Sequence, residues 1–148
     1  PPYAKGIFLD LASIAKRAEE MIRAFNVKTP SRDTPLKNLS GGNIQKLILA
    51  RELSRSPRVL VAAQPTRGVD IGAMEYIHQQ LVAQRSEGTA TLLISEDLDE
   101  IQNLSDRIAV IYEGQIMGIV KRGEADAKEL GLMMAGVRRE DAVPTAAD

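Results

Sequence analysis

The chain has no cysteine, no tryptophan and a single histidine among its 148 residues. The absence of cysteine excludes disulfides and thiolate metal sites, and one histidine, His78, excludes a metal site built from several histidines. Aromatic residues make up only 3% of the chain, which argues against a surface that stacks single-stranded nucleic acid. The net charge of −1 gives no indication of a nucleic acid or an anionic membrane surface as partner.

Long apolar runs and a signal peptide are also missing from the sequence. Hydrophobic residues make up 44% and charged residues 26%, which is typical of a soluble globular domain with a hydrophobic core. The chain begins Pro1-Pro2-Tyr3 without an initiator methionine, and we therefore interpret it as a piece of a longer protein.

The hydrophobic pattern predicts an α/β fold. Apolar residues at three- and four-residue spacing predict helices, over residues 10–26, 44–53, 71–85, 98–104 and 126–135. Short apolar runs at 59–63 and 89–95 predict two strands of a parallel sheet, buried on both faces and joined by a right-handed helical crossover. Two further strands, 108–112 and 115–120, flank Glu113-Gly114 and predict a C-terminal β-hairpin.

The same pattern divides the chain into three parts. Residues 1–55 contain no predicted strand, and we expect them to form an N-terminal helical lobe. Residues 56–136 contain the predicted strands and form the sheet-bearing core. Residues 137–148 are predicted to be a loose tail.

The segment Leu39–Asn43, LSGGN, precedes a predicted helix and allows two interpretations. In one, Ser40 is simply an N-cap and the glycines allow the chain to turn into the helix. In the other, the glycines leave the backbone N–H groups of the helix start accessible to a phosphate, because a helix N-terminus binds anions. The segment alone does not decide between them. His78, within the third predicted helix, is interpreted as a packing or surface residue rather than a catalytic one.

Three segments, residues 39–43, 59–70 and 93–100, resemble in this order the second half of the ATPase domain of ABC transporters. LSGGN is similar to the family's signature motif, and residues 59–66, VLVAAQPT, resemble its Walker B segment. Residues 67–70 resemble the D-loop, and residues 94–97 the switch region. The resemblance covers roughly residues 8–136 and is greatest to the C-terminal ATPase domain of sugar and nucleoside importers. It implies a partial P-loop NTPase core.

The chain departs from the family pattern at three points. No P-loop, G-x-x-x-x-G-K-[ST], is present, so the piece alone has no phosphate cradle and is expected to be inactive. Ala63 and Gln64 occupy the places of the Walker B aspartate, associated with magnesium, and of the catalytic glutamate. Glu96 occupies the place where the family often has a phosphate-sensing histidine. No metal ligand is therefore expected within the chain.

The resemblance implies an ATPase subunit that works with ATP and Mg²⁺ in the full protein. Two ATPase domains of the family pair head to tail, so that Ser40, Gly41, Gly42 and Asn43 would bind ATP held by a partner domain, and Asp70 would make an inter-domain contact. The implied partners are membrane permease subunits and, indirectly, a substrate-binding protein, at the cytoplasmic face of the membrane, with no nucleic acid. Three other interpretations stay open. The chain could be a regulatory or scaffolding domain without ATP turnover, or part of a soluble ABC-class ATPase that is not a transporter. In the third, the upstream half also lacks a P-loop and the protein is not an ATPase.

Overall fold

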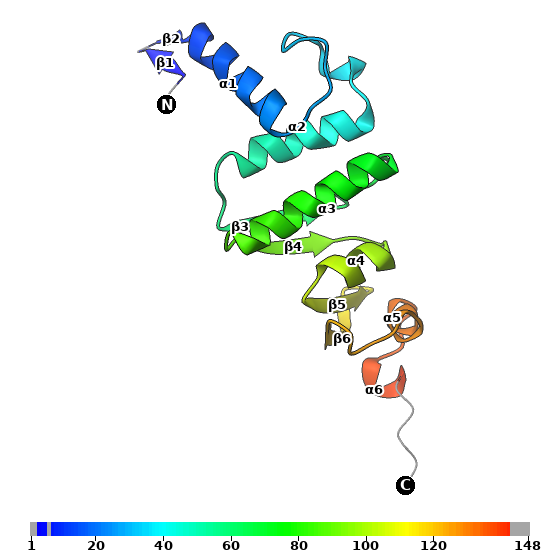
Figure 1. Cartoon of the computed structure of the whole chain (residues 1–148). Helices are drawn as coiled ribbons and strands as arrows, with labels where there is room; N and C mark the ends of the chain where they lie inside the picture. The colour runs from blue at the N-terminus through cyan, green and yellow to red at the C-terminus, as the bar shows by residue number, and fades with distance from the viewer. Residues whose placement is uncertain (1–2, 6, 143–148) are drawn as a thin grey trace. The chain divides into compact units, whose positions relative to one another are not determined.

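The computed structural model describes residues 3–5 and 7–142 (Figure 1). Contacts within the chain group it into two compact units, Pro1–Leu92 and Leu93–Asp148, here called the N-terminal and C-terminal units. The predicted division of the chain at residue 55 stays a prediction. Among the described residues, none of the helices has the length and apolar character needed to span a bilayer.

The N-terminal unit contains most of the expected helices. Its elements are β1 (Ala4–Lys5), β2 (Phe8–Leu9), α1 (Leu11–Ala24), the short 3-10 helix η1 (Leu36–Asn38), α2 (Gly41–Leu53), β3 (Val59–Ala63), α3 (Ile71–Ser86) and most of β4 (Ala90–Ile94). β1 and β2 form a two-stranded antiparallel pair. The expectation of no strand before residue 55 was therefore wrong, because a two-residue pairing is too short to leave an alternating pattern.

Side-chain caps determine where the helices begin. Asp10 accepts a hydrogen bond from the Ser13 backbone N–H at 3.1 Å, and Asp70 accepts one from Ala73 at 2.9 Å. Such caps satisfy N–H groups that have no partner within the helix. In the C-terminal unit the cap of α4 is Asp97, whose side chain accepts from the backbone N–H groups of Asp99 and Glu100.

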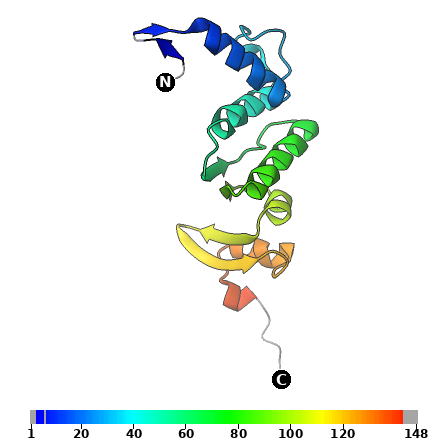
Figure 2. The same cartoon turned by 60° about the vertical axis from the view of Figure 1, so that its left-hand side comes forward.

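Helix α2 begins three residues earlier than the sequence predicted, since it includes both glycines of LSGGN. Its inward face includes Lys46, which is buried, whereas Ile48 is 41% exposed. α2 packs between α1 and α3, as Figure 1 and Figure 2 show. The positions of α1 and α3 decide which face of α2 is covered. The hydrophobic pattern of α2 alone does not predict those positions.

β3 and β4 pair in parallel, as predicted. Their burial differs from the prediction. Leu60 and Ala62 of β3 are buried, but Val59 and Val61 are 66% and 60% exposed, and Leu92 of β4 is 57% exposed. The prediction that both strands are buried on both faces was therefore wrong for the described chain. A continuous apolar run permits burial on both faces, but helices cover only one face of β3 here.

The C-terminal unit is built around a hairpin. It contains α4 (Leu98–Leu104), β5 (Arg107–Tyr112), β6 (Gln115–Lys121), α5 (Ala127–Met134) and α6 (Arg139–Ala142). β5 and β6 are antiparallel, with Tyr112 opposite Gln115, which confirms the predicted hairpin. The two turn residues, Glu113 and Gly114, have φ angles of 47° and 78°. Positive φ at both central residues is the requirement of the tight turn that suits strand twist.

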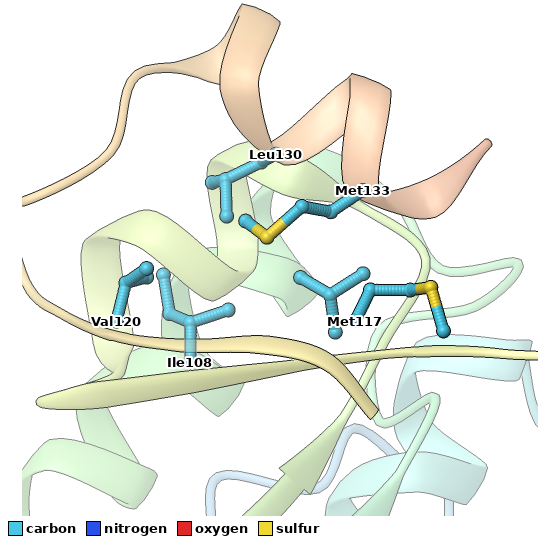
Figure 3. Packing of buried hydrophobic residues seen from close by; sticks show 6 residues of the cluster. Ile108, Met117, Val120, Leu130 and Met133 are labelled. Carbon is cyan, nitrogen blue, oxygen red and sulfur yellow. The ribbon is translucent and has the colours of Figure 1, made fainter. Parts of the chain in front are cut away.

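The core of the C-terminal unit lies between the hairpin and α5. Figure 3 shows Leu130 and Met133 of α5 pointing toward the side chains of β5 and β6. The buried cluster consists of Ile108, Val110, Met117, Val120, Leu130 and Met133. The predicted loose tail was wrong for α6, which Arg139 joins to Glu129 of α5 through a 3.2 Å hydrogen bond. The rest of that prediction, residues 143–148, lies outside the described residues.

Candidate functional site

The start of α2 holds the first group of predicted site residues. Ser40 lies in an extended conformation before the helix and is exposed. Its Oγ accepts hydrogen bonds from two N–H groups of Asn43, the backbone N at 3.4 Å and the side-chain Nδ2 at 2.9 Å. Ser40 is therefore an N-cap, as the sequence indicated, and its side chain lies at the protein surface.

Asn43 is turned inward from the same helix start. Its Oδ1 accepts a 2.7 Å hydrogen bond from the backbone N–H of Lys28, in the turn that follows α1. Its side chain is half-buried. Asn43 thus joins the cap of α2 to a segment fifteen residues upstream.

Gly41 and Gly42 are needed for close packing and not for an unusual backbone angle, because neither has a positive φ. A Cβ on Gly42 would lie 2.6 Å from the Ala73 Cβ and 3.2 Å from Asp70 Oδ2. A Cβ on Gly41 would lie 3.2 Å from the Gly68 carbonyl oxygen. The sequence prediction that the glycines allow a turn was therefore wrong. They allow the start of α2 to approach the loop 67–70 and the first turn of α3.

Two residues that the sequence reasoning left without a role complete this region. Lys46, one turn after Asn43, is 9% exposed, and its Nζ donates to the Asn26 carbonyl oxygen at 3.3 Å. The same ammonium group lies 4.6 Å from the centre of the Tyr76 ring, a cation–π contact with α3. Burial raises the pKa of the Tyr76 hydroxyl. The burial of Lys46 was not predictable from the sequence, because lysine is a charged residue and its spacing from other residues gave no indication of an inward position.

The end of β3 holds the second group of predicted residues. Ala63 is exposed and presents a methyl group, and Gln64 is half-buried with a φ of 48°. The Gln64 carbonyl accepts from the Arg67 N–H at 3.2 Å, which closes the turn after the strand. Magnesium prefers carboxylate and water oxygens, so Ala63 and Gln64 do not fit this ion. Within residues 3–5 and 7–142, no cluster of three or more His, Asp or Glu side chains is arranged to hold a metal.

Glu96 belongs to the C-terminal unit and is described separately. It is exposed and directly precedes Asp97, the cap of α4. The Asp97 backbone N–H donates to Ser95 Oγ at 3.1 Å. Ser95 therefore supports the segment before the helix and is not itself the cap.

Several known proteins are similar to this chain, although no family model matches it. The guanosine import ATP-binding protein NupO of Bacillus subtilis is 48% identical over 141 residues, which are 95% of this chain and 28% of that protein. The nucleoside import ATP-binding protein NupA of Lactococcus lactis is 50% identical over 136 residues, 92% of this chain and 27% of that protein. The chain thus spans about a quarter of the length of these relatives.

Solved structures with the same fold are ABC cassettes. One ATP-binding cassette of an ABC transporter superposes with a TM-score of 0.68 over 84% of this chain and 49% of its own, at 22% identity. The chain has the sequence and the fold of part of an ABC ATPase domain. A nucleotide-free ABC cassette superposes with a TM-score of 0.64 over 74% of the chain, at 26% identity. The resemblance and the α/β fold class predicted from the sequence are confirmed.

Within this partial ABC ATPase domain, the structure brings two of the predicted motifs together. The signature segment 39–43 lies against the D-loop residues Gly68 and Asp70. Of the four predicted signature residues, Ser40 and Gly41 are exposed, whereas Gly42 is buried and Asn43 is half-buried. The roles of these residues, and those of Ala63, Gln64 and Glu96, stay predictions.

Proposed function

We propose that this chain is part of the ATP-binding subunit of an ABC importer and that it presents its signature segment to ATP held by a second ATPase domain. One observation carries the proposal. Ser40 and Gly41 are exposed at the N-terminus of α2, whereas β3 ends at Ala63 and is followed by Gln64, so neither position carries a carboxylate. The chain therefore offers a phosphate-binding helix start but lacks the metal ligand and base that its own site would need.

The chemistry of the helix start suits a phosphate. The first N–H groups of a helix have no partner within the helix, and its dipole places partial positive charge there. Ser40 adds a hydroxyl that can donate to a phosphate oxygen. The inward side of the segment is held by α3, because Gly42 lies against Ala73. Ser40 and Gly41 are thus the residues that would face the ligand.

The chemistry at the end of β3 suits slow turnover. A glutamine amide orients water but is a poor proton acceptor, and loss of a positioned base lowers a rate by about 10²–10⁴-fold. Ala63 supplies no oxygen for magnesium. Glu96 would place a negative charge where the family often has a histidine. We propose one competent site, made with the partner's P-loop and this signature, and one site that retains nucleotide with little hydrolysis.

The relatives suggest partners and cargo. Their names assign them to the import of guanosine, nucleosides, glucose and ribose. We propose a nucleoside or a simple sugar as the transported substrate, with permease subunits and a substrate-binding protein as further partners. The subunit would act as a peripheral protein at the cytoplasmic face of the membrane.

The first experiment measures nucleotide occupancy in the full-length subunit assembled with its permease, during turnover. ATP retained and ADP formed are counted per subunit. One retained ATP beside one steadily hydrolysed ATP supports the proposal. Equal turnover at both sites contradicts the assignment of Ala63, Gln64 and Glu96 to a slow site.

A pair of serine variants tests the signature. Ser40→Ala should lower ATP hydrolysis by about tenfold or more, because a hydrogen bond to a charged phosphate is lost. Ser54→Ala is the matched control: Ser54 lies at the other end of α2 and donates to the Arg51 carbonyl at 3.0 Å. Full activity in Ser40→Ala would favour a regulatory or scaffolding domain that binds no ATP at its signature.

A further inference from the structure

The hydrogen bonds around Ser40 constrain the direction of its hydroxyl proton. A serine oxygen accepts at two lone pairs and donates one hydrogen. In this structure both acceptor directions are used by Asn43, through its backbone N at 3.4 Å and its Nδ2 at 2.9 Å. The remaining capacity of the Ser40 hydroxyl is to donate, and Ser40 lies at the surface.

The orientation of the Asn43 amide is itself determined by its surroundings. The two ends of an asparagine amide are assigned from the hydrogen-bond network. Lys28 supplies a backbone N–H 2.7 Å away, which can only donate, so the oxygen of Asn43 must face it. The nitrogen must then face Ser40 and act as the donor there.

The turn that supplies this N–H is held to α2 at a second point. Lys46 Nζ, one turn further along α2, donates to the Asn26 carbonyl at 3.3 Å. Between these two contacts lies Val27, which is 7% exposed. Asn43 and Lys46 thus each make a hydrogen bond to the turn 26–28, one at either end of it.

From this network we infer that Asn43 is a positioning residue that makes the Ser40 hydroxyl a hydrogen-bond donor toward the phosphate. The inference rests on the proposed function, since it specifies how the signature segment meets its ligand. Asn43 would act through Ser40, because its amide oxygen accepts from Lys28 and its amide nitrogen donates to Ser40.

The test makes the substitution Asn43→Asp in the full-length subunit with its permease. The carboxylate introduced by this change still accepts from Lys28 but can no longer donate to Ser40, so the Ser40 hydroxyl turns inward to donate to it. ATP hydrolysis should fall by about tenfold or more. The thermal midpoint should not fall, because a carboxylate in the first turn of a helix is favoured by the dipole. A merely structural role of Asn43 would not separate these two readouts.

A double variant distinguishes hydroxyl orientation from simple charge repulsion. Adding Asn43→Asp to Ser40→Ala should change the rate by less than about twofold, since the hydroxyl is already gone. An equal loss in both backgrounds would show that the new charge repels the phosphate and would overturn the inference. Asn38→Asp, an exposed change of the same kind two residues before Ser40, is the charge control and should leave the rate within about twofold.

The remaining outcomes separate the inference from the proposed function. If Ser40→Ala leaves hydrolysis unchanged, the proposed function fails. If Ser40→Ala lowers hydrolysis but Asn43→Asp does not, only the inference about Asn43 is wrong. Loss of hydrolysis in Asn43→Asp together with a lower thermal midpoint also overturns it, because the residue would then act through stability.

Discussion

The two units of the chain differ in how far their apolar strands are buried. In the C-terminal unit, Val120 of β6 is 1% exposed beneath α5. In the N-terminal unit, Val61 of β3 is 60% exposed, although it also lies in an apolar strand. A valine in a strand is therefore buried only where another element covers its face. The amino-acid type sets the free energy available from burial, and the neighbouring helix decides whether that free energy is realised.

Close approach through glycine occurs in both units. Gly42 allows α2 to meet α3, and a Cβ on Gly118 of β6 would lie 2.7 Å from Met133 Sδ and 2.9 Å from the Arg139 Cβ. In both places the absence of a side chain on the glycine allows two elements to come into contact. The two glycines differ in their surroundings: Gly42 lies in the proposed ligand-binding segment, and Gly118 is half-buried beside Met133 and Arg139.

The largest expected effect is at the closed core of the C-terminal unit. Leu130→Ala should lower the free energy of unfolding by about 2–5 kcal/mol, because Leu130 is 0% exposed and leaves a cavity. Leu132→Ala is the control on the same helix, at 37% exposure, and should cost less than about 1 kcal/mol. Denaturant unfolding with amide exchange over residues 107–134 measures both. Equal losses would mean that α5 does not close this core.

The next effect concerns the contact between α2 and α3. Gly42→Ala should cost about 1–3 kcal/mol, because its Cβ would lie 2.6 Å from the Ala73 Cβ. In an Ala73→Gly background the same change should cost less than about 0.5 kcal/mol, because the overlapping methyl group is gone. Thermal unfolding of the unchanged chain, the two single variants and the double variant gives the coupling. An unchanged cost in both backgrounds would show that the glycine is needed for another reason.

A smaller, stabilising effect is expected at Tyr76. Its hydroxyl oxygen is buried and has no hydrogen-bond partner among the described residues, so Tyr76→Phe should raise the free energy of unfolding by about 1 kcal/mol. The Lys46 contact with the ring is kept. Denaturant unfolding near neutral pH measures the gain, and a loss of stability would indicate that the hydroxyl has a partner.

The same residue predicts a pH dependence. Because burial raises the pKa of Tyr76, its neutral form contributes stability that is complete below about pH 10 and is lost as the pH rises through the raised value. The Tyr76→Phe variant should not show this part of the loss of stability at alkaline pH. The free energy of unfolding of the two proteins is compared from about pH 8 to above the free tyrosine pKa of about 10. Identical profiles would contradict the shift.

The smallest effect is expected on the exposed face of β3. Val61→Thr should change the free energy of unfolding by less than about 0.5 kcal/mol, since the side chain is 60% exposed. Val120→Thr, at 1% exposure, should cost about 1–3 kcal/mol, because a hydroxyl is buried. Thermal unfolding of the 148-residue chain compares them. A large cost at Val61 would show that this face of β3 is covered.

Local features of the fold were largely predictable from the sequence. Ser40 was recognised as a possible helix cap, and Glu113-Gly114 as a hairpin turn, because both depend on residues within a few positions of one another. The ABC resemblance was also visible, since LSGGN, the strand 59–63 and the loop 67–70 occur in the family's order. Their roles in turnover depend on a second domain and stay predictions.

The sequence by itself determined the order of the elements, their caps and the family. Only the tertiary structure decided which faces are covered: it buried Lys46, exposed Ile48 and left Val61 at the surface. It also decided that Gly42 serves the contact with Ala73 and that Asn43 orients toward Lys28. The physical reason is the separation along the chain of the residues that interact. Caps and turns depend on neighbours along the chain, whereas burial and close packing depend on which distant segment arrives at each face.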